Sequence, residues 1–325
     1  MNLLQDSNKT QGRNVHIKYF FMMFFFSVLL LAVDLQPLKE IEGLDAEKVE
    51  LGKKLFHDPI LSKDHKISCA TCHNLMHNGA DITKVTAGSE GLSGHFNVPT
   101  VYNAVYNFRQ FWDGRSKNLK DQALAPISNP VEMGNTLSVA IEDLQKSRDY
   151  PRLFNAIYKD GITENNLAEV IAEFEKTLTT LNSPFDNYLR GDESALDPDC
   201  LEGYRLFKQK GCIFCHNGVN IGGNLYNKFG IYKDANSKEL GRYNITHKEE
   251  DMYVFKVPSL RNVALTAPYM HDGRAETLKD AVLIMSQYQL GRSMKEKELQ
   301  AIVCFLKSLT GELPQIFRDI NVKDN

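Results

Sequence analysis

The chain has 325 residues, which is enough for two compact domains with a core each. Its formal net charge is −3, and no dense block of Lys and Arg interrupts the sequence, which argues against nucleic acid as a partner. A local patch that docks another protein remains compatible with this balance.

The first predicted element is an export segment. Basic residues precede an apolar run at 19–33. This run has the length of a signal-peptide core and is shorter than the about 20 residues that span a bilayer comfortably. Because Ala32-Val33-Asp34 is a weak cleavage site, an uncleaved membrane anchor stays open as an alternative. We expect residues 1–34 to be a signal peptide or N-terminal anchor, with the rest of the chain outside the cytoplasm.

A short helix at residues 45–56, with Asp45 as its N-cap, is expected to lead into the pentapeptide Cys69-Ala-Thr-Cys72-His73. The same pattern recurs as Cys212-Ile-Phe-Cys215-His216. Two thiols three positions apart can form thioethers to one haem, and the adjoining His can reach the iron. Each copy is therefore interpreted as a covalent c-type haem site.

A zinc site, a disulfide pair and a redox Cys-x-x-Cys are the alternatives for these motifs. Zinc would not require a His directly after each second Cys. A thioredoxin-like motif would need a βαβ context, which the sequence pattern lacks. Two copies in one chain therefore predict two covalently bound haem c groups.

Two further stretches repeat at matched spacing, which indicates an internal duplication. Asn97-Val-Pro-Thr is followed by Phe-Trp112-Asp-Gly-Arg, and Val257-Pro-Ser-Leu-Arg is followed by Met-His271-Asp-Gly-Arg. In both halves, thirteen positions separate the Pro from the residue before Asp-Gly-Arg. Trp112 and His271 therefore occupy equivalent positions.

Between and after the repeats, helices and a linker are predicted. Thr163 can cap a helix whose regular apolar stripe begins at Leu167. The stretch 182–199 gathers Pro, Gly and Asp and is expected to be the inter-domain linker. Ser293 and Glu296 form a capping box that predicts a last helix.

Few runs alternate with a period of two, so the predicted fold is mainly α. With the duplication, this predicts two cytochrome c-like haem domains, the first at residues 35–190 and the second at residues 191–325. Four of the six Cys belong to the haem motifs. For the other two, Cys200 and Cys304, a disulfide and buried free thiols both remain open.

Together these motifs resemble the bacterial di-haem cytochrome c peroxidases, over about residues 37–315. Further segments that match this family are Asn129-Pro-Val-Glu-Met133, Ala267-Pro-Tyr-Met-His-Asp-Gly273 and Gln289-Leu-Gly291. The resemblance implies that an N-terminal low-potential haem reduces hydrogen peroxide. It implies that a C-terminal high-potential haem takes electrons from a small donor, a cytochrome c or a cupredoxin. It further implies a periplasmic location, a calcium ion between the domains and a homodimer.

For the second haem, a Met opposite the His would raise the potential. The second half offers Met252, Met270, Met285 and Met294. Met285 matches the axial Met of the family, so the expected ligands are His216 and Met285. His73 is expected to bind the first iron.

For the first haem, the resemblance implies an open distal side with an acid/base group. Glu132 matches the family's distal carboxylate, and Gln122 is expected beside it. Peroxide must lose a proton and its leaving oxygen must gain one, which a positioned carboxylate can serve. Trp112, the single Trp, matches the aromatic residue that lies between the haems.

The family's calcium ligands carry over as the side chain of Asn97 and the carbonyls of Thr266 and Pro268. Hard oxygen donors with few carboxylates suit Ca²⁺ completed by water.

One position departs from the family pattern. Many members place a His, which blocks the resting peroxidatic haem, where this chain has Ser89 in the Gly-rich loop 78–97. That loop is expected to form one wall of a haem pocket. His95 or His77 could replace the missing ligand, and otherwise the sixth position would be open.

Two other functions are alternatives for this sequence. A di-haem cytochrome that only transfers electrons would have two six-coordinate haems and no peroxide turnover. Related oxidases that modify protein side chains carry Tyr where this chain has Met285 and therefore fit less well.

Overall fold

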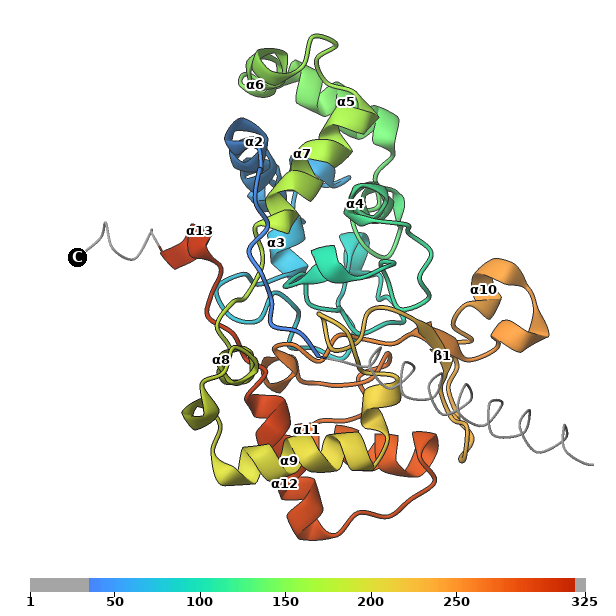
Figure 1. Ribbon diagram of the computed structural model, residues 1–325. Helices are drawn as coiled ribbons and strands as arrows, with labels where there is room; N and C mark the ends of the chain where they lie inside the picture. Colours follow the sequence, from blue (N-terminus) through green and yellow to red (C-terminus); the bar gives the residue numbers. More distant parts are fainter. Residues whose placement is uncertain (1–34, 319–325) are drawn as a thin grey trace, which may run out of the picture.

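The computed structural model describes residues 35–318, and the fold is mainly helical, as predicted (Figure 1). The helices are α2 (Ala46–His57), α3 (Cys69–Cys72), α4 (Leu119–Ser128), α5 (Leu137–Lys146), α6 (Tyr150–Ile157), α7 (Glu164–Lys176), α8 (Pro184–Leu189), α9 (Pro198–Gln209), α10 (Tyr243–Thr246), α11 (Leu278–Ile284), α12 (Glu296–Lys307) and α13 (Gln315–Arg318). Two short strands, β1 (Tyr226–Lys228) and β2 (Val254–Lys256), pair antiparallel. Most of the remaining chain forms loops and single turns.

In the first half, α2 crosses α7 at Gly52 (upper part of Figure 1). A Cβ on Gly52 would lie 1.9 Å from the carbonyl oxygen of Val170, so this backbone approach requires Gly. Asp45 caps α2 as predicted, and Thr163 caps α7 as predicted. The core around the crossing draws on α2, α4, α5, α6 and α7, with Leu51, Leu55, Ala123, Ile127, Leu144, Phe154, Leu167, Val170 and Ile171 among its buried residues.

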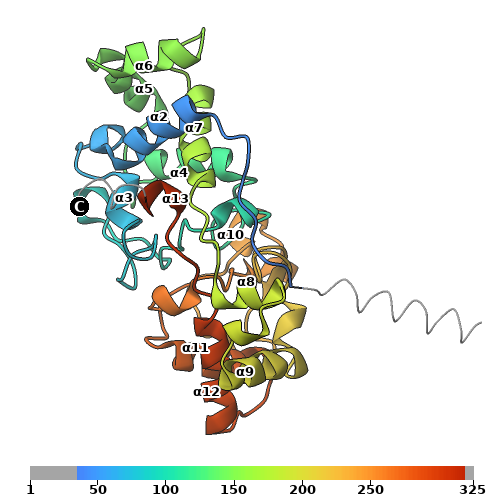
Figure 2. The ribbon, with the colours of Figure 1, turned by 60° about the vertical axis from the view of Figure 1, so that its left-hand side comes forward.

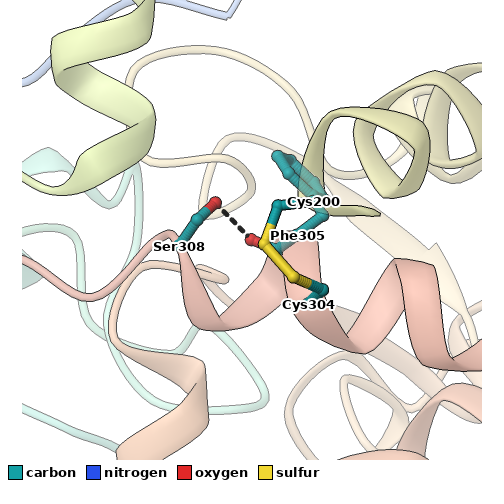
Figure 3. The surroundings of a disulfide bond; sticks show 4 residues. All are labelled: Cys200, Cys304, Phe305 and Ser308. Atoms are coloured by element: carbon teal, nitrogen blue, oxygen red, sulfur yellow. Dashed lines mark hydrogen bonds between the residues drawn. A yellow bond between two sulfur atoms is a disulfide. The ribbon is translucent and has the colours of Figure 1, made fainter. Parts of the chain in front are cut away.

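The second half repeats this crossing with α9 and α12. A Cβ on Gly203 would again lie 1.9 Å from a carbonyl oxygen, here that of Ala301. One turn away, a disulfide joins Cys200 to Cys304, which resolves the alternative left open by the sequence (Figure 3). The Ser308 hydroxyl donates to the Phe305 carbonyl at 2.7 Å beside it.

Both halves meet at one buried hydroxyl, that of Thr180. Asn103 and Asn262 are equivalent in the duplication, and both are left-handed, with φ of 60° and 59°. Their side-chain amides each donate to Thr180 Oγ1 at 2.8 Å. In return, the N–H of Thr180 donates to Asn103 Oδ1, and that of Gly311 donates to Asn262 Oδ1. The same contact is therefore made twice, once from each half.

Both ends of the described chain cross to the opposite half. Leu35 is buried in the core of the second half. Arg261 fixes this N-terminal segment because it pairs with Asp186 at 2.9 Å and donates to the Gln36 carbonyl. At the other end, Phe317 of α13 packs into the core of the first half, and Figures 1 and 2 both place α13 beside α3. Each half is thus held by a terminal segment of the other.

The stretch 182–199, predicted to be a linker, contains α8. Ser183 caps this helix and Pro184 takes its first position, so residues that also favour turns here start a helix. Phe185 is fully buried in the core of the second half. By its packing, α8 therefore belongs with the second half, although the expected domain boundary at 190/191 would assign it to the first.

The predicted capping box of the last long helix is wrong. α12 begins at Glu296, and the N–H of Lys295 donates to the carboxylate of Glu298 at 3.0 Å. The acidic residue at the third helical position therefore caps the helix, and Ser293 lies outside it.

No helix within residues 35–318 is both long and apolar enough to cross a bilayer. The predicted export segment, residues 1–34, lies outside the described residues.

Candidate haem sites

The first Cys-x-x-Cys-His motif folds as a single helical turn. The N–H of Ser68 donates to Thr71 Oγ1 at 3.0 Å, which caps the turn. Cys69 and Cys72 lie three positions apart and therefore share one face. The N–H of His73 donates to the Cys69 carbonyl at 2.9 Å, so the turn closes with the His beside both thiols.

His73 is held as a neutral imidazole. Its Nδ1 lies 3.0 Å from the Gly79 carbonyl oxygen, and since a carbonyl only accepts, Nδ1 must carry the proton. Burial lowers the pKa of His73, against the opposing effect of this hydrogen bond. The lone pair of Nε2 is then the one that can bind a metal, as in a proximal haem ligand.

The second motif makes the same closed turn, because the N–H of His216 donates to the Cys212 carbonyl at 3.0 Å. Burial lowers the pKa of His216 to about 4, so this imidazole is also neutral. Its Nδ1 has no partner in hydrogen-bond geometry within residues 35–318, although the Pro258 backbone lies nearby. Gly222 permits this approach, since its Cβ would lie 2.2 Å from the Pro258 carbonyl oxygen and 3.3 Å from His216 Nδ1.

A cavity of about 250 Å³ opens from the second motif. Its lining includes Cys212, Cys215, His216 and Met285, the four residues predicted to hold the second haem. The thiols of both motifs are unpaired in the structure. Two thiols, a neutral imidazole and a thioether are a donor set that fits a covalently attached haem with His and Met ligands.

Met285 directly follows α11, which Thr277 caps. It begins a π-helical turn, Met285–Gln289, a form that is frequent at functional sites. Met270 and Met294 also line the cavity, whereas Met252 is not among the lining residues. Three Met residues therefore line the cavity, and the choice of Met285 among them rests on the family resemblance.

Trp112, a residue of the first half, also lines this cavity. Its indole N–H donates to the Asn97 carbonyl at 2.8 Å, and its own carbonyl accepts from the N–H of Lys256 at 2.8 Å. The ring centroid lies 6.3 Å from that of His271, its counterpart in the duplication. Trp112 therefore contacts residues of both halves.

Glu132 lies in the turn between α4 and α5, next to the first motif. Asn129 Nδ2 donates to its Oε1 at 2.6 Å. Burial raises the pKa of Glu132, and the contacts with Asn129 and Arg115 oppose the rise. Its charge is a minor cause, after burial, of the raised pKa of both Cys69 and Cys72.

Gln122 lies half-buried on α4, the helix that Asn118 caps through the N–H of Asp121 at 2.9 Å. No hydrogen bond joins its side chain to Glu132 in the part of the chain that the structure describes. The structure therefore places Glu132 in the turn that follows α4 and Gln122 on α4 itself.

Ser89 is buried against the Glu132 turn. Its N–H donates to the Glu132 carbonyl at 2.7 Å, and its hydroxyl has no partner among residues 35–318. Gly88 allows this packing, because its Cβ would lie 2.1 Å from the Val131 carbonyl oxygen. The loop 78–97 thus forms a wall next to Glu132.

The two His residues considered as replacements for the missing ligand face solvent. The side chain of His95 is 75% exposed, and its Nδ1 lies 3.8 Å from Glu239 Oε1. His77 is also exposed. In this conformation neither imidazole is buried at the first haem motif.

The three residues expected to bind calcium line one cavity. Asn97, Thr266 and Pro268 all belong to the wall that also holds the second motif. Asn97 Nδ2 donates to the carbonyls of Thr83 and Lys84, which leaves its Oδ1 as a potential ligand. Within the described residues, no group of three His, Cys, Asp or Glu could hold a metal ion, so such a site would depend on amide and carbonyl oxygens.

Lys256 is a site residue that the sequence reasoning missed. It is 6% exposed, lines the cavity of the second motif, and burial lowers its pKa to about 8. No Asp or Glu of the described chain lines this cavity. The available signal was its position, since Lys256 stands in the second repeat where the first has Asn97.

Comparisons with known proteins agree with this arrangement. A family profile described as "Di-haem cytochrome c peroxidase" matches residues 46–194. The chain is 46% identical over 283 residues to the cytochrome c551 peroxidase of Nitrosomonas europaea, covering 86% of this chain and 85% of that protein. It is 44% identical over 291 residues to the cytochrome c551 peroxidase of Pseudomonas aeruginosa, covering 86% and 84%.

Among solved structures, a MauG-like protein associated with microbial copper homeostasis is similar to the chain. The TM-score is 0.75 at 26% sequence identity, with 85% of this chain and 93% of that chain covered. The diheme peroxidase BthA from Burkholderia thailandensis matches the fold with a TM-score of 0.70 at 20% identity, covering 86% and 90%.

Proposed function

The chain belongs to the di-haem cytochrome c peroxidase family, and from this membership we propose how its two haem sites divide the work. The reaction is the reduction of hydrogen peroxide to two water molecules, with two protons and two electrons that a cytochrome c supplies. We assign peroxide reduction to the His73 site and electron intake to the site of His216 and Met285.

Two haem c groups fit the donor sets of this chain. Cys69 and Cys72 would hold the first group, and Cys212 and Cys215 the second. Bound haem supplies iron at which peroxide is reduced and through which electrons pass. The protein's contribution is to keep His73 and His216 neutral, to fix the tautomer of His73 through the Gly79 carbonyl, and to provide the thioether of Met285 at the second site.

Glu132 is proposed as the acid/base group of the first site. Its carboxylate accepts a proton from the incoming peroxide and returns a proton to the oxygen that leaves as water. Asn129 orients the carboxylate through the 2.6 Å hydrogen bond to Oε1. The raised pKa brings Glu132 closer to the value at which a group both accepts and donates protons effectively. Gln122 is proposed as its distal neighbour.

Trp112 is proposed as the contact between the two sites. Its indole is bonded to Asn97 of the first half, while its carbonyl is bonded to Lys256 of the second. A fixed aromatic side chain at this junction favours electron transfer from the second haem to the first. The proposed calcium ion, held by Asn97, Thr266 and Pro268, would stabilise the same junction, since Asn97 is common to both.

Location and assembly are further proposals. The disulfide between Cys200 and Cys304 supports an oxidising compartment, which agrees with export to the periplasm. Residues 19–33 would act as signal or anchor. A small cytochrome c or a cupredoxin would donate electrons, and the protein would form a homodimer.

The observation that carries the assignment is the unequal placement of two side chains, with the half-buried Glu132 in the first half and Met285 in the cavity of the second motif. Stopped-flow spectra of the half-reduced protein mixed with peroxide test it. We expect a rapid spectral change at one haem and turnover with reduced cytochrome c. Two six-coordinate haems that do not respond to peroxide would instead identify a carrier that only transfers electrons.

A further inference from the structure

Glu175 is a buried carboxyl group that the proposed reaction does not use. It lies near the end of α7 and is 4% exposed. Its Oε2 has no hydrogen-bond partner among residues 35–318. An unpaired buried carboxyl is costly, so its presence calls for a function or for a partner that the protein chain does not provide.

The duplication indicates which residue of the second half corresponds to Glu175. Gly52 contacts the Val170 carbonyl and the Phe174 Cβ, and Gly203 makes the same two contacts with Ala301 and Phe305. Phe174 and Phe305 are therefore equivalent. The residues that follow them are Glu175 in the first half and Leu306 in the second.

Leu306 lines the cavity of the second haem motif. By equivalence, Glu175 faces the corresponding site of the first motif. A second observation agrees, because the charge of Glu175 is a cause, after burial, of the raised pKa of the Cys69 thiol. The carboxyl group therefore lies at the end of the site where the first haem would be attached.

The charged groups packed around α7 are paired elsewhere. Lys48 of α2 and Lys120 of α4 both bind Glu169, and Lys176 binds Glu173. Burial raises the pKa of Glu175 to about 8. The charge of Glu175 in turn contributes to the raised pKa of the Cys69 thiol. Thioether formation would remove that thiol as a titratable group, and the haem attached there would be the group whose charge changes.

We propose that Glu175 lowers the reduction potential of the first haem and couples its reduction to uptake of one proton, a function absent from the second half, where Leu306 stands. An ionised carboxyl near the haem stabilises the oxidised form, which carries one more positive charge. When an electron arrives, that charge is lost and the carboxylate binds a proton from solvent. One electron and one proton then enter the apolar site together.

This inference rests on haem attachment at Cys69 and Cys72 under the proposed function. Its test is a spectroscopic redox titration of the holoprotein at pH about 6 and about 9, on either side of the raised carboxyl pKa. The variants are Glu175→Gln, which keeps the shape, and Glu175→Leu, which introduces the side chain that the second half uses. Glu164→Gln, an exposed change on the same helix, is the control.

In the wild type and the control, the potential of the first haem should fall as pH rises, approaching one proton per electron, or about 59 mV per pH unit. In both Glu175 variants this dependence should be reduced, and the potential at pH about 9 should be higher than in the wild type. Potentials that follow the wild type at both pH values would overturn the inference.

Infrared difference spectra of the wild type give a measurement that needs no variant for its signal. A band of a protonated carboxyl should appear on reduction of the first haem, and its absence would also overturn the inference. Haem content and peroxide turnover separate the two proposals. Unchanged potentials in a chain with two haems and full turnover would remove the role of Glu175 alone, whereas a missing first haem would remove the proposed function.

Discussion

The two halves share a scaffold and differ in a few side chains that decide the chemistry. In each half, two helices cross at a Gly and the Cys-x-x-Cys-His motif forms a closed turn. In each half, an Asn side-chain amide also donates a hydrogen bond to Thr180. The second half lines its cavity with Met285, the proposed sulfur ligand, whereas the first half has Glu132, the proposed acid/base group. Under the proposed function, a duplicated fold would acquire two functions by changing the residues around the haem site while the supporting scaffold stays constant.

The largest effect is expected from Glu132→Gln, which removes the proton acceptor of the first half. Peroxide turnover should fall by about 10²- to 10⁴-fold, the usual contribution of a general acid/base group. Both haems should stay bound, because Glu132 neither attaches a haem nor fixes a residue that attaches one. Steady-state assays and haem content measure the two outcomes, and full activity would remove Glu132 from the mechanism.

The pH dependence sharpens the same point. Turnover needs Glu132 ionised, so the rate should fall as pH drops through its pKa. Since burial raises that pKa, the fall should begin at a higher pH than for an ordinary Glu with a pKa of about 4.3. A rate that stays constant down to the ordinary value would contradict the role of a buried base.

The next largest effect concerns the buried ion pair of Arg261 and Asp186, which fixes the N-terminal segment against the second half. Arg261→Met leaves the Asp186 carboxylate buried and unpaired, which should lower the free energy of unfolding by about 3–5 kcal/mol. Lys146→Met breaks the exposed pair with Glu142 and should cost much less, because solvent-exposed ion pairs contribute little to stability. Chemical denaturation compares the two variants, and equal losses would show that the buried pair does not fix the N-terminal segment.

The disulfide should make the second half more resistant to unfolding than the first. The positions equivalent to Cys200 and Cys304 hold Val49 and Glu173, so the first half lacks this link. Replacing both Cys with Ala should lower stability by about 2–4 kcal/mol. The loss should appear in unfolding followed at the second haem, and an unchanged transition would argue that the bond contributes nothing.

A smaller effect is expected from Met285→Leu. The soft thioether favours ferrous iron, so its loss should lower the potential of the second haem and slow the arrival of electrons. Met294→Leu, which removes another sulfur from the same cavity, is the matched control. If the control shifts the potential and Met285→Leu does not, the ligand assignment is wrong.

The sequence predicts local features of this molecule well and long-range contacts poorly. The haem motifs, the caps at Asp45 and Thr163 and the helical class follow from patterns within a few residues. The crossing of Leu35 into the second core and of Phe317 into the first has no local signal, because both depend on contacts far apart in sequence. The sequence predicts a linker where α8 stands, because Ser and Pro start both turns and helices.

The candidate site shows the same division. Glu132 and Met285 are proposed from motif resemblance, since their residue types and neighbours carry the signal. Lys256 and Glu175 were missed, because a charged residue in a sequence is usually exposed and only tertiary packing buries these two. Their positions became interpretable when the structure aligned the two repeats.

The central claim is that the first haem keeps an open distal position while the second is closed by a sulfur ligand. Electron paramagnetic resonance of the fully oxidised protein tests it directly, with His95→Ala as the comparison. We predict a high-spin signal from one haem, unchanged by the substitution, because His95 faces solvent beside Glu239. Two low-spin signals, one of them lost in His95→Ala, would contradict the claim and show that the loop 78–97 brings this His to the iron.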